Sequence, residues 1–418
     1  MIHDFATWAP LLRLVHVEPG GHVAGQVGRG SWSVPTAPRS GRMEDMRAEF
    51  DAVKRVQDAL GGRDSVEFVA QAPAPGRLVL HVLDRGPAVE DGLGPYPGSL
   101  VFADGAVPEP WRRLPAPGNA APAPTADPDL LERALREQLP DAVGASEAEV
   151  AAVEARLGVT LPDELRTLYR VTRSWWEWSL DEVYVADAAS RSTLWRFAAT
   201  EAIPAPTAET AVQQLAGSPG WIVFADSGGG DRFAVDLTPG PAGHLGQIIL
   251  IDHETNVGAE LYADSLTDLV LNRRSSRGPD PRGDRPPLVA RVNIRSLPSV
   301  EAAADPDLEV LGIGVWNGPP VDLAPVSRLP RLRTLTAYPG TLADPLQVAG
   351  LTGLEYLRLG RAEWRVLLDA GAVPPGLLAA GIEVQGNPNP LPVVDLANEL
   401  LATRNRPLIT DTVLEGDV

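Results

Sequence analysis

The stretch ASEAEVAAVEARLGVTLPDELRTLYRVT, residues 145–172, predicts two consecutive helices. Ser146 and Glu149 have the spacing of a capping box, in which each side chain accepts a hydrogen bond from the other residue's backbone amide. Gly158 marks the end of the first helix, and Pro162 stands where the second begins. The apolar faces that this spacing predicts are Val150, Val153 and Leu157 in the first helix and Leu165, Leu168 and Tyr169 in the second.

Strand patterns follow these helices. The stretch WIVFADSGGGDRFAVDL, residues 221–237, predicts a hairpin, because glycines 228–230 permit the positive φ angles that a tight turn needs. GQIILIDHET, residues 246–255, predicts a third strand, and ADSLTDLV, residues 263–270, predicts a closing helix that begins at Ser265. This order of helices and strands predicts an α+β fold for the middle of the chain.

The same four motifs, in the same order, resemble those of the SUKH superfamily, which includes the fungal regulator of cell-wall synthesis and many bacterial immunity proteins. The resemblance covers residues 129–273. It implies an α+β domain that binds other proteins, often toxins encoded beside it, and that has no established catalysis. One departure is local: where the family usually has an Asn-Gly turn, this chain has Arg173-Ser174-Trp175-Trp176-Glu177-Trp178.

Negative charge is concentrated in this middle region. Residues 129–273 contain 10 arginines and no lysine against 23 aspartates and glutamates, a balance of −13, and the whole chain has a net charge of −19. Such a surface repels phosphate backbones, so we expect no direct nucleic-acid binding, whereas it would attract a basic protein such as a nuclease toxin. The alternative is that the acidic surface only maintains solubility.

Eight residues are candidates for partner binding. Three tryptophans within four residues cannot all face one side of a strand or helix, so we expect at least one near the surface unless another block covers it. Trp195 is a further aromatic candidate beside them. The carboxylates lie around the glycine turn and after the third strand. The predicted partner-binding residues are Trp175, Trp176, Trp178, Asp226, Asp231, Asp236, Asp252 and Glu254.

The carboxylates also admit other interpretations. Asp226, Asp231 and Asp252 with His253 could form the site of a metal-dependent hydrolase, but there is no HExxH motif, no EF-hand loop and no second histidine nearby. Alternatively, these aspartates only accept hydrogen bonds from turn amides. We expect binding without catalysis, with no catalytic residue, no metal and no cofactor.

Two proline-rich stretches, residues 115–128 and 274–287, are predicted to be linkers that do not pack. They leave a first block, residues 1–114, which is predicted to be a small α+β domain with a helix at 43–60 and strands at 77–83 and 100–102. We assign this block no function.

The third block, residues 288–403, contains three L-x-x-L-x-L patterns, at Leu308, Leu332 and Leu354, with a degenerate turn at Ile382 and a possible cap at 290–294. These patterns predict a short leucine-rich-repeat-like solenoid, although the usual asparagine after each strand is missing. The array could be a recognition surface or a scaffold that packs on the middle domain. Residues after Arg404 are predicted to be a loose tail.

Composition narrows the possible functions. The chain has 418 residues and no cysteine, which excludes disulfides, thiolate nucleophiles and zinc sites that use cysteine. It has no apolar run of about 18 residues, so we expect no membrane partner and a cytoplasmic location. The leading hypothesis is a multidomain α+β protein that binds and neutralises a basic toxin without chemistry. A regulatory scaffold that bridges two partners is the alternative.

Overall fold

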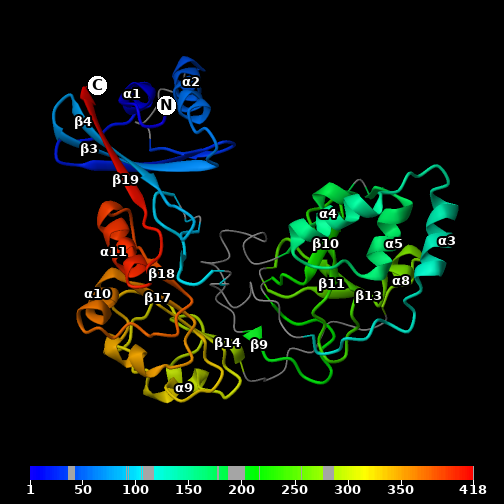
Figure 1. Ribbon diagram of the computed structural model, residues 1–418. Helices are drawn as coiled ribbons and strands as arrows, with labels where there is room; N and C mark the ends of the chain where they lie inside the picture. Colours follow the sequence, from blue (N-terminus) through cyan, green and yellow to red (C-terminus); the bar gives the residue numbers. More distant parts are fainter. Residues whose placement is uncertain are drawn as a thin grey trace. The chain divides into compact units, whose positions relative to one another are not determined.

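The computed structural model describes residues 1–35, 43–90, 92, 94–104, 106, 117–176, 178–186, 203–215, 217–255, 257–275 and 287–417 (Figure 1). The chain divides into two compact units of mixed helix and sheet. Unit 1 consists of Met1–Pro108, Pro319–Asp322 and Leu335–Val418, and unit 2 consists of Glu109–Gly318 and Leu323–Thr334. Within the described ranges, every helix falls short of the length and apolar content that crossing a membrane requires.

Unit 1 contains a five-stranded antiparallel sheet in the order β19-β4-β3-β1-β2. Two helices pack on one of its faces, where Trp8, Phe68 and Leu80 are buried in a common core. The predicted helix at 43–60 and strand at 77–83 are confirmed. The elements are α1 (Phe5–Leu12), β1 (His22–Gly28), β2 (Trp32–Ser33), α2 (Met43–Asp58), β3 (Ser65–Ala74), β4 (Arg77–Asp84) and β19 (Thr410–Asp417).

The prediction of a loose tail after Arg404 is wrong. Strand β19 pairs with the whole of β4, from Thr410 opposite Asp84 to Asp417 opposite Arg77. An ion pair and a hydrogen-bond contact across the strands reinforce this register: Arg77 with Glu415 at 2.5 Å, and His81 Nδ1 with Asp411 Oδ2 at 2.7 Å. The last residues of the chain therefore complete the edge of a sheet built by its first hundred.

The remainder of unit 1 contains part of the leucine-patterned region. Strands β16, β17 and β18 are neighbours in one sheet, β17 and β18 are parallel, and β5 is antiparallel to β18. The second and third leucine patterns thus form strands, with Leu335 and Leu357 fully buried. The elements are β5 (Leu100–Val101), β16 (Thr334–Ala337), η4 (Pro345–Gly350), β17 (Tyr356–Gly360), α10 (Arg361–Asp369), β18 (Ala379–Glu383) and α11 (Leu391–Ala402).

The core of unit 2 is the middle block, residues 117–275, in which helices cover one face of a five-stranded antiparallel sheet of order β13-β12-β11-β10-β8. Leu165, Leu168 and Tyr169 are fully buried between helices and sheet, as the spacing predicts. The elements are α3 (Pro128–Gln138), α4 (Glu147–Leu157), α5 (Asp163–Val171), β8 (Tyr184–Val185), β10 (Trp221–Asp226), β11 (Arg232–Asp236), β12 (Gln247–Ile251), β13 (Glu260–Ala263) and α8 (Leu266–Val270).

Local chemistry explains the helix ends. Both hydrogen bonds of the predicted capping box are present at α4: Ser146 N donates to Glu149 Oε2 at 2.8 Å, and Glu149 N donates to Ser146 Oγ at 3.3 Å. Gly158 ends the helix at φ +71°. The α5 residue Glu164 is buried, and its carboxylate accepts the backbone amides of Leu266 and Thr267, which anchors the first turn of α8.

The first proline-rich stretch is only partly described, and the prediction that it does not pack is wrong from residue 117 onward. Gly118 N donates to Pro239 O at 2.7 Å, and Leu245 N donates to Ala121 O at 2.9 Å. Thr125 Oγ1 donates to Asp268 Oδ2 at 2.5 Å. These contacts use backbone and hydroxyl groups, which explains why a low apolar content did not reveal them. In the second stretch, residues 276–286 lie outside the described residues.

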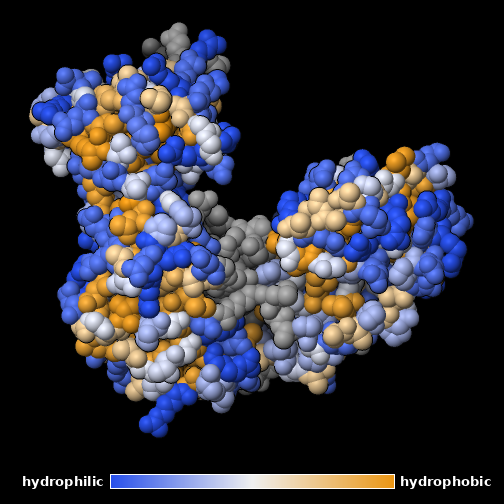
Figure 2. Space-filling model, in the orientation of Figure 1, coloured by the Kyte–Doolittle hydropathy of each residue, from blue (hydrophilic) through white to orange (hydrophobic). Residues whose placement is uncertain are grey.

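Unit 2 also contains the first leucine pattern. Strands β14 and β15 are parallel, and β9 pairs antiparallel with β14. The predicted cap at 290–294 overlaps β14. The elements are β9 (Ile203–Pro204), β14 (Pro287–Val292), α9 (Val300–Ala303), β15 (Val310–Ile313) and η3 (Ala324–Val326). On the face shown in Figure 2, hydrophobic residues are interspersed among hydrophilic ones in both units.

Candidate protein-binding surface

The three clustered tryptophans lie on a short hairpin that follows α5. Strands β6 (Ser174–Trp175) and β7 (Trp178–Ser179) pair with Trp175 opposite Trp178, which leaves two residues for the turn. A two-residue hairpin turn of the favoured type requires positive φ at its first position, and Trp176 has φ +48° there. Tryptophan therefore adopts the left-handed conformation in this turn.

The hairpin distributes the three indoles over different environments. Trp175 is buried at 7% exposure, Trp176 is 46% exposed, and Trp178 is half-buried. The expectation that at least one tryptophan lies near the surface therefore holds for Trp176, whereas burial excludes Trp175 from direct contact with a partner. Trp195 lies outside the described residues.

Trp176 joins a row of aromatic rings. Its ring stacks on Trp175, with centroids 5.5 Å apart, and meets Phe233 edge-on at 5.2 Å. Phe233 in turn meets Tyr262 edge-on at 4.9 Å. Phe233 and Tyr262 were not among the predicted site residues, although Phe233 follows Asp231 by two residues, the interval that returns to the same face of a strand.

The Asp226 carboxylate accepts a hydrogen bond within the glycine turn. Gly228 N donates to Asp226 Oδ1 at 2.5 Å, and Arg232 forms an ion pair with the same carboxylate. The Arg232 guanidinium also lies 5.5 Å above the ring of Trp178. The Arg232 guanidinium is therefore held between the aromatic face of Trp178 and the carboxylate of Asp226.

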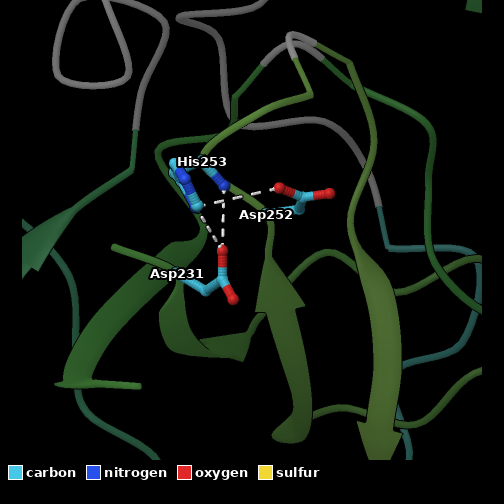
Figure 3. A group of neighbouring side chains, drawn as sticks. All are labelled: Asp231, Asp252 and His253. Carbon is cyan, nitrogen blue, oxygen red and sulfur yellow. Dashed lines mark hydrogen bonds and ion pairs between the residues drawn. The ribbon is translucent and has the colours of Figure 1, made fainter. Parts of the chain in front are cut away.

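Asp231, Asp252 and His253 come together where β11 begins and β12 ends (Figure 3). His253 Nδ1 lies 2.7 Å from Asp231 Oδ1 and 4.0 Å from Asp252 Oδ1. The hydrogen bond between the two side chains lowers the pKa of Asp231 and raises the pKa of His253. Asp252 also accepts Glu254 N at 2.7 Å, and the Glu254 side chain is exposed.

This group offers three potential metal ligands whose atoms lie within 4.8 Å of one another. A carboxylate pair with an imidazole suits a divalent cation or proton transfer. In the structure, however, the Asp231 carboxylate and the His253 ring bind each other. Asp226, the fourth residue of the hydrolase hypothesis, pairs with Arg232 and is not part of this group.

Asp236 was predicted to bind a partner, and the structure contradicts this. Its side chain is fully buried, accepting Thr238 N at 2.8 Å through Oδ1 and Gln247 Nε2 at 2.9 Å through Oδ2. Burial raises its pKa to about 6. Asp236 lies five residues after Asp231, and an odd interval along a strand places two side chains on opposite faces.

Comparison with known proteins confirms the family resemblance of this block. Residues 144–272 match the SMI1 / KNR4 family (SUKH-1). The chain is 36% identical over 97 residues to the "Glucan synthesis regulatory protein" of Neurospora crassa, covering 22% of this chain and 18% of that protein. It is 40% identical over 70 residues to the "Cell wall biosynthesis/cell cycle regulator smi1" of Schizosaccharomyces pombe, covering 16% and 14%. The chain thus spans less than a fifth of either relative.

Proposed function

We propose that the SUKH-1 domain at residues 144–272 binds a protein partner without catalysis, and that this binding neutralises a basic bacterial toxin in the cytoplasm. The observation that carries the proposal is the exposure of Trp176: its backbone has φ +48° in a tight turn, and 46% of the residue's surface is exposed. Tryptophan is one of the residues most enriched among the hot spots of protein interfaces. The balance of −13 over residues 129–273 favours a basic partner.

The test uses the whole chain and the basic proteins encoded beside its gene. We expect one of them to form a complex whose affinity falls with added salt, and Trp176→Ala should weaken that complex by about 30-fold, the effect of a typical hot-spot residue. Trp32→Ala is the matched control, because Trp32 is also partly exposed, at 36%, but lies in unit 1. Equal affinities for the wild type and Trp176→Ala would contradict the proposal.

A regulatory scaffold is the second candidate. It is favoured by the similarity to two proteins named as regulators, and by the strands that the leucine patterns form. In this role, the leucine-rich-repeat-like region would be a second recognition surface. Cross-linking of the full chain, followed by mass spectrometry, separates the two functions: a scaffold gives different partners on residues 144–272 and 308–384, whereas a toxin inhibitor gives one.

The proposal assigns no catalytic step to Asp231, Asp252 and His253. Its support is the direct pairing of Asp231 with His253, in which Asp231 Oδ1 and His253 Nδ1 are used for each other. Metal analysis of the purified chain, compared with Asp231→Ala, tests this. Stoichiometric metal that disappears in the variant would favour the hydrolase hypothesis instead.

A further inference from the structure

The aromatic row and the carboxylates lie on the same face of the sheet. Asp231 directly precedes β11, and Phe233 follows it by two residues, so strand alternation directs both side chains to one face about 7 Å apart. The register of Arg232 with Ile251 places Asp231 opposite Asp252. Trp176 covers Phe233. We call Trp176, Phe233, Asp231, Asp252 and Glu254 the aromatic–acidic surface.

The neighbouring tryptophan shows which chemistry fits such an arrangement. Beside Trp178, the guanidinium of Arg232 lies 5.5 Å above the indole and pairs with Asp226. Arg274 likewise lies 4.8 Å above the ring of Tyr262. Among the described residues, no such cation–aromatic contact is formed at Trp176. At Trp178 the domain's own arginine therefore links an indole to a carboxylate, whereas Trp176 contacts Phe233, two residues after Asp231.

Arginine suits this arrangement better than lysine. The planar guanidinium can stack on an indole while its N–H groups donate to a carboxylate in the same plane, whereas an ammonium group has no planar face. Asp252 lies next to the Asp231–His253 pair (Figure 3), with its Oδ1 4.0 Å from His253 Nδ1. Glu254 adds a second, exposed negative charge in the same loop.

We propose that the aromatic–acidic surface receives an arginine side chain of the basic partner, stacked on Trp176 and hydrogen-bonded to Asp252. This inference rests on the proposed function and specifies the chemistry of the contact. It predicts that a partner loses affinity when one interfacial arginine is replaced, even by lysine.

The experiment measures arginine binding to the full chain directly. The chain is labelled with 5-fluorotryptophan, and the Trp176 resonance is assigned by its absence in Trp176→Phe. The probes are the peptides Ac-Gly-Arg-Gly-Arg-Gly-NH₂ and Ac-Gly-Lys-Gly-Lys-Gly-NH₂ at low salt. We expect a saturable shift of the Trp176 resonance with the arginine peptide, and binding weaker by about fivefold with the lysine peptide, since an ammonium group lacks the planar face and the forked N–H donors of a guanidinium.

Two variants locate the carboxylate. Asp252→Asn keeps an oxygen to accept Glu254 N and should weaken arginine-peptide binding by about fivefold or more. Glu137→Gln removes one charge from the exposed side of α3 and should leave it unchanged. An unmoved Trp176 resonance, or equal binding of both peptides and both variants, overturns the inference. Failure here, with Trp176→Ala still weakening the partner complex, would leave the proposed function standing.

Discussion

Asp236 should make the middle block more stable as the pH falls toward 4, in contrast to carboxylates that form ion pairs. Its carboxylate is fully buried and is bound by the neutral groups of Thr238 and Gln247. Burial is the largest influence and raises its pKa from 3.8 to about 6. The folded state therefore holds the proton more tightly than the unfolded chain does.

The sign and size of the effect follow from these two pKa values. Because the folded pKa is the higher one, the stabilisation is fully present below about pH 4 and is lost as the pH rises through about 6. The difference between 3.8 and about 6 corresponds to about 3 kcal/mol in the free energy of unfolding. Asp236→Asn cannot titrate, so comparing it with the wild type at each pH isolates this contribution.

Hydrogen exchange with mass spectrometry, on peptides covering β11 and β12, provides the measurement. Between about pH 7.5 and 4.5, the opening free energy of the wild type should rise relative to Asp236→Asn by about 2 kcal/mol. The variant itself places an amide donor near Gln247 Nε2, but that cost is the same at every pH. A difference between the two proteins that stays constant over this range would refute the reasoning.

Three further changes test the packing. Glu164→Ala leaves the amides of Leu266 and Thr267 without their acceptor and should lower the free energy of unfolding by about 2–3 kcal/mol, with a smaller loss for Glu164→Gln, measured by urea unfolding. Gly144→Ala should lower the melting temperature, because its Cβ would lie 1.8 Å from Arg170 O, whereas Gly62→Ala, which meets nothing within 4 Å, should not. Removing residues 410–417 should speed amide exchange in β4 by at least about tenfold, and unchanged exchange would show that β19 does not protect that edge.

The elements that could be predicted are those whose signals are local. The capping box at Ser146 and the glycines of the β10–β11 turn act within a few residues, so the sequence pattern alone indicated α4 and the hairpin. Strand β19 could not be predicted in the same way, because its partner β4 lies more than 300 residues earlier in the chain. The cap of helix α3, Asp127, lies within the proline-rich stretch 115–128, whose composition predicts a linker and not the start of a helix.

The candidate site shows the same limit. The sequence pattern indicated Asp231, Asp252 and His253 together as candidate residues, and the register of β11 with β12 does place them side by side. The sequence pattern did not distinguish the buried Asp236 from Asp231. The difference depends on the odd interval between them along a strand, and the sequence pattern indicates the bounds of that strand only approximately. Phe233 was not predicted as a site residue, because an aromatic residue within a strand usually belongs to the hydrophobic core.

Trp176 is where local preference and observed structure conflict most. The two-residue turn between Trp175 and Trp178 requires a positive φ at Trp176, a conformation that glycine or asparagine adopts with less steric strain. A tryptophan in this conformation costs about 1–2 kcal/mol, and its contacts with Trp175 and Phe233 return about 0.5–1.5 kcal/mol each. These terms roughly cancel, so folding gives little reason to prefer tryptophan here. Within the described part of the chain, the ring contacts of Trp176 are those with Trp175 and Phe233, and 46% of its surface stays exposed. A surface that serves a partner is the reason that the proposed function supplies.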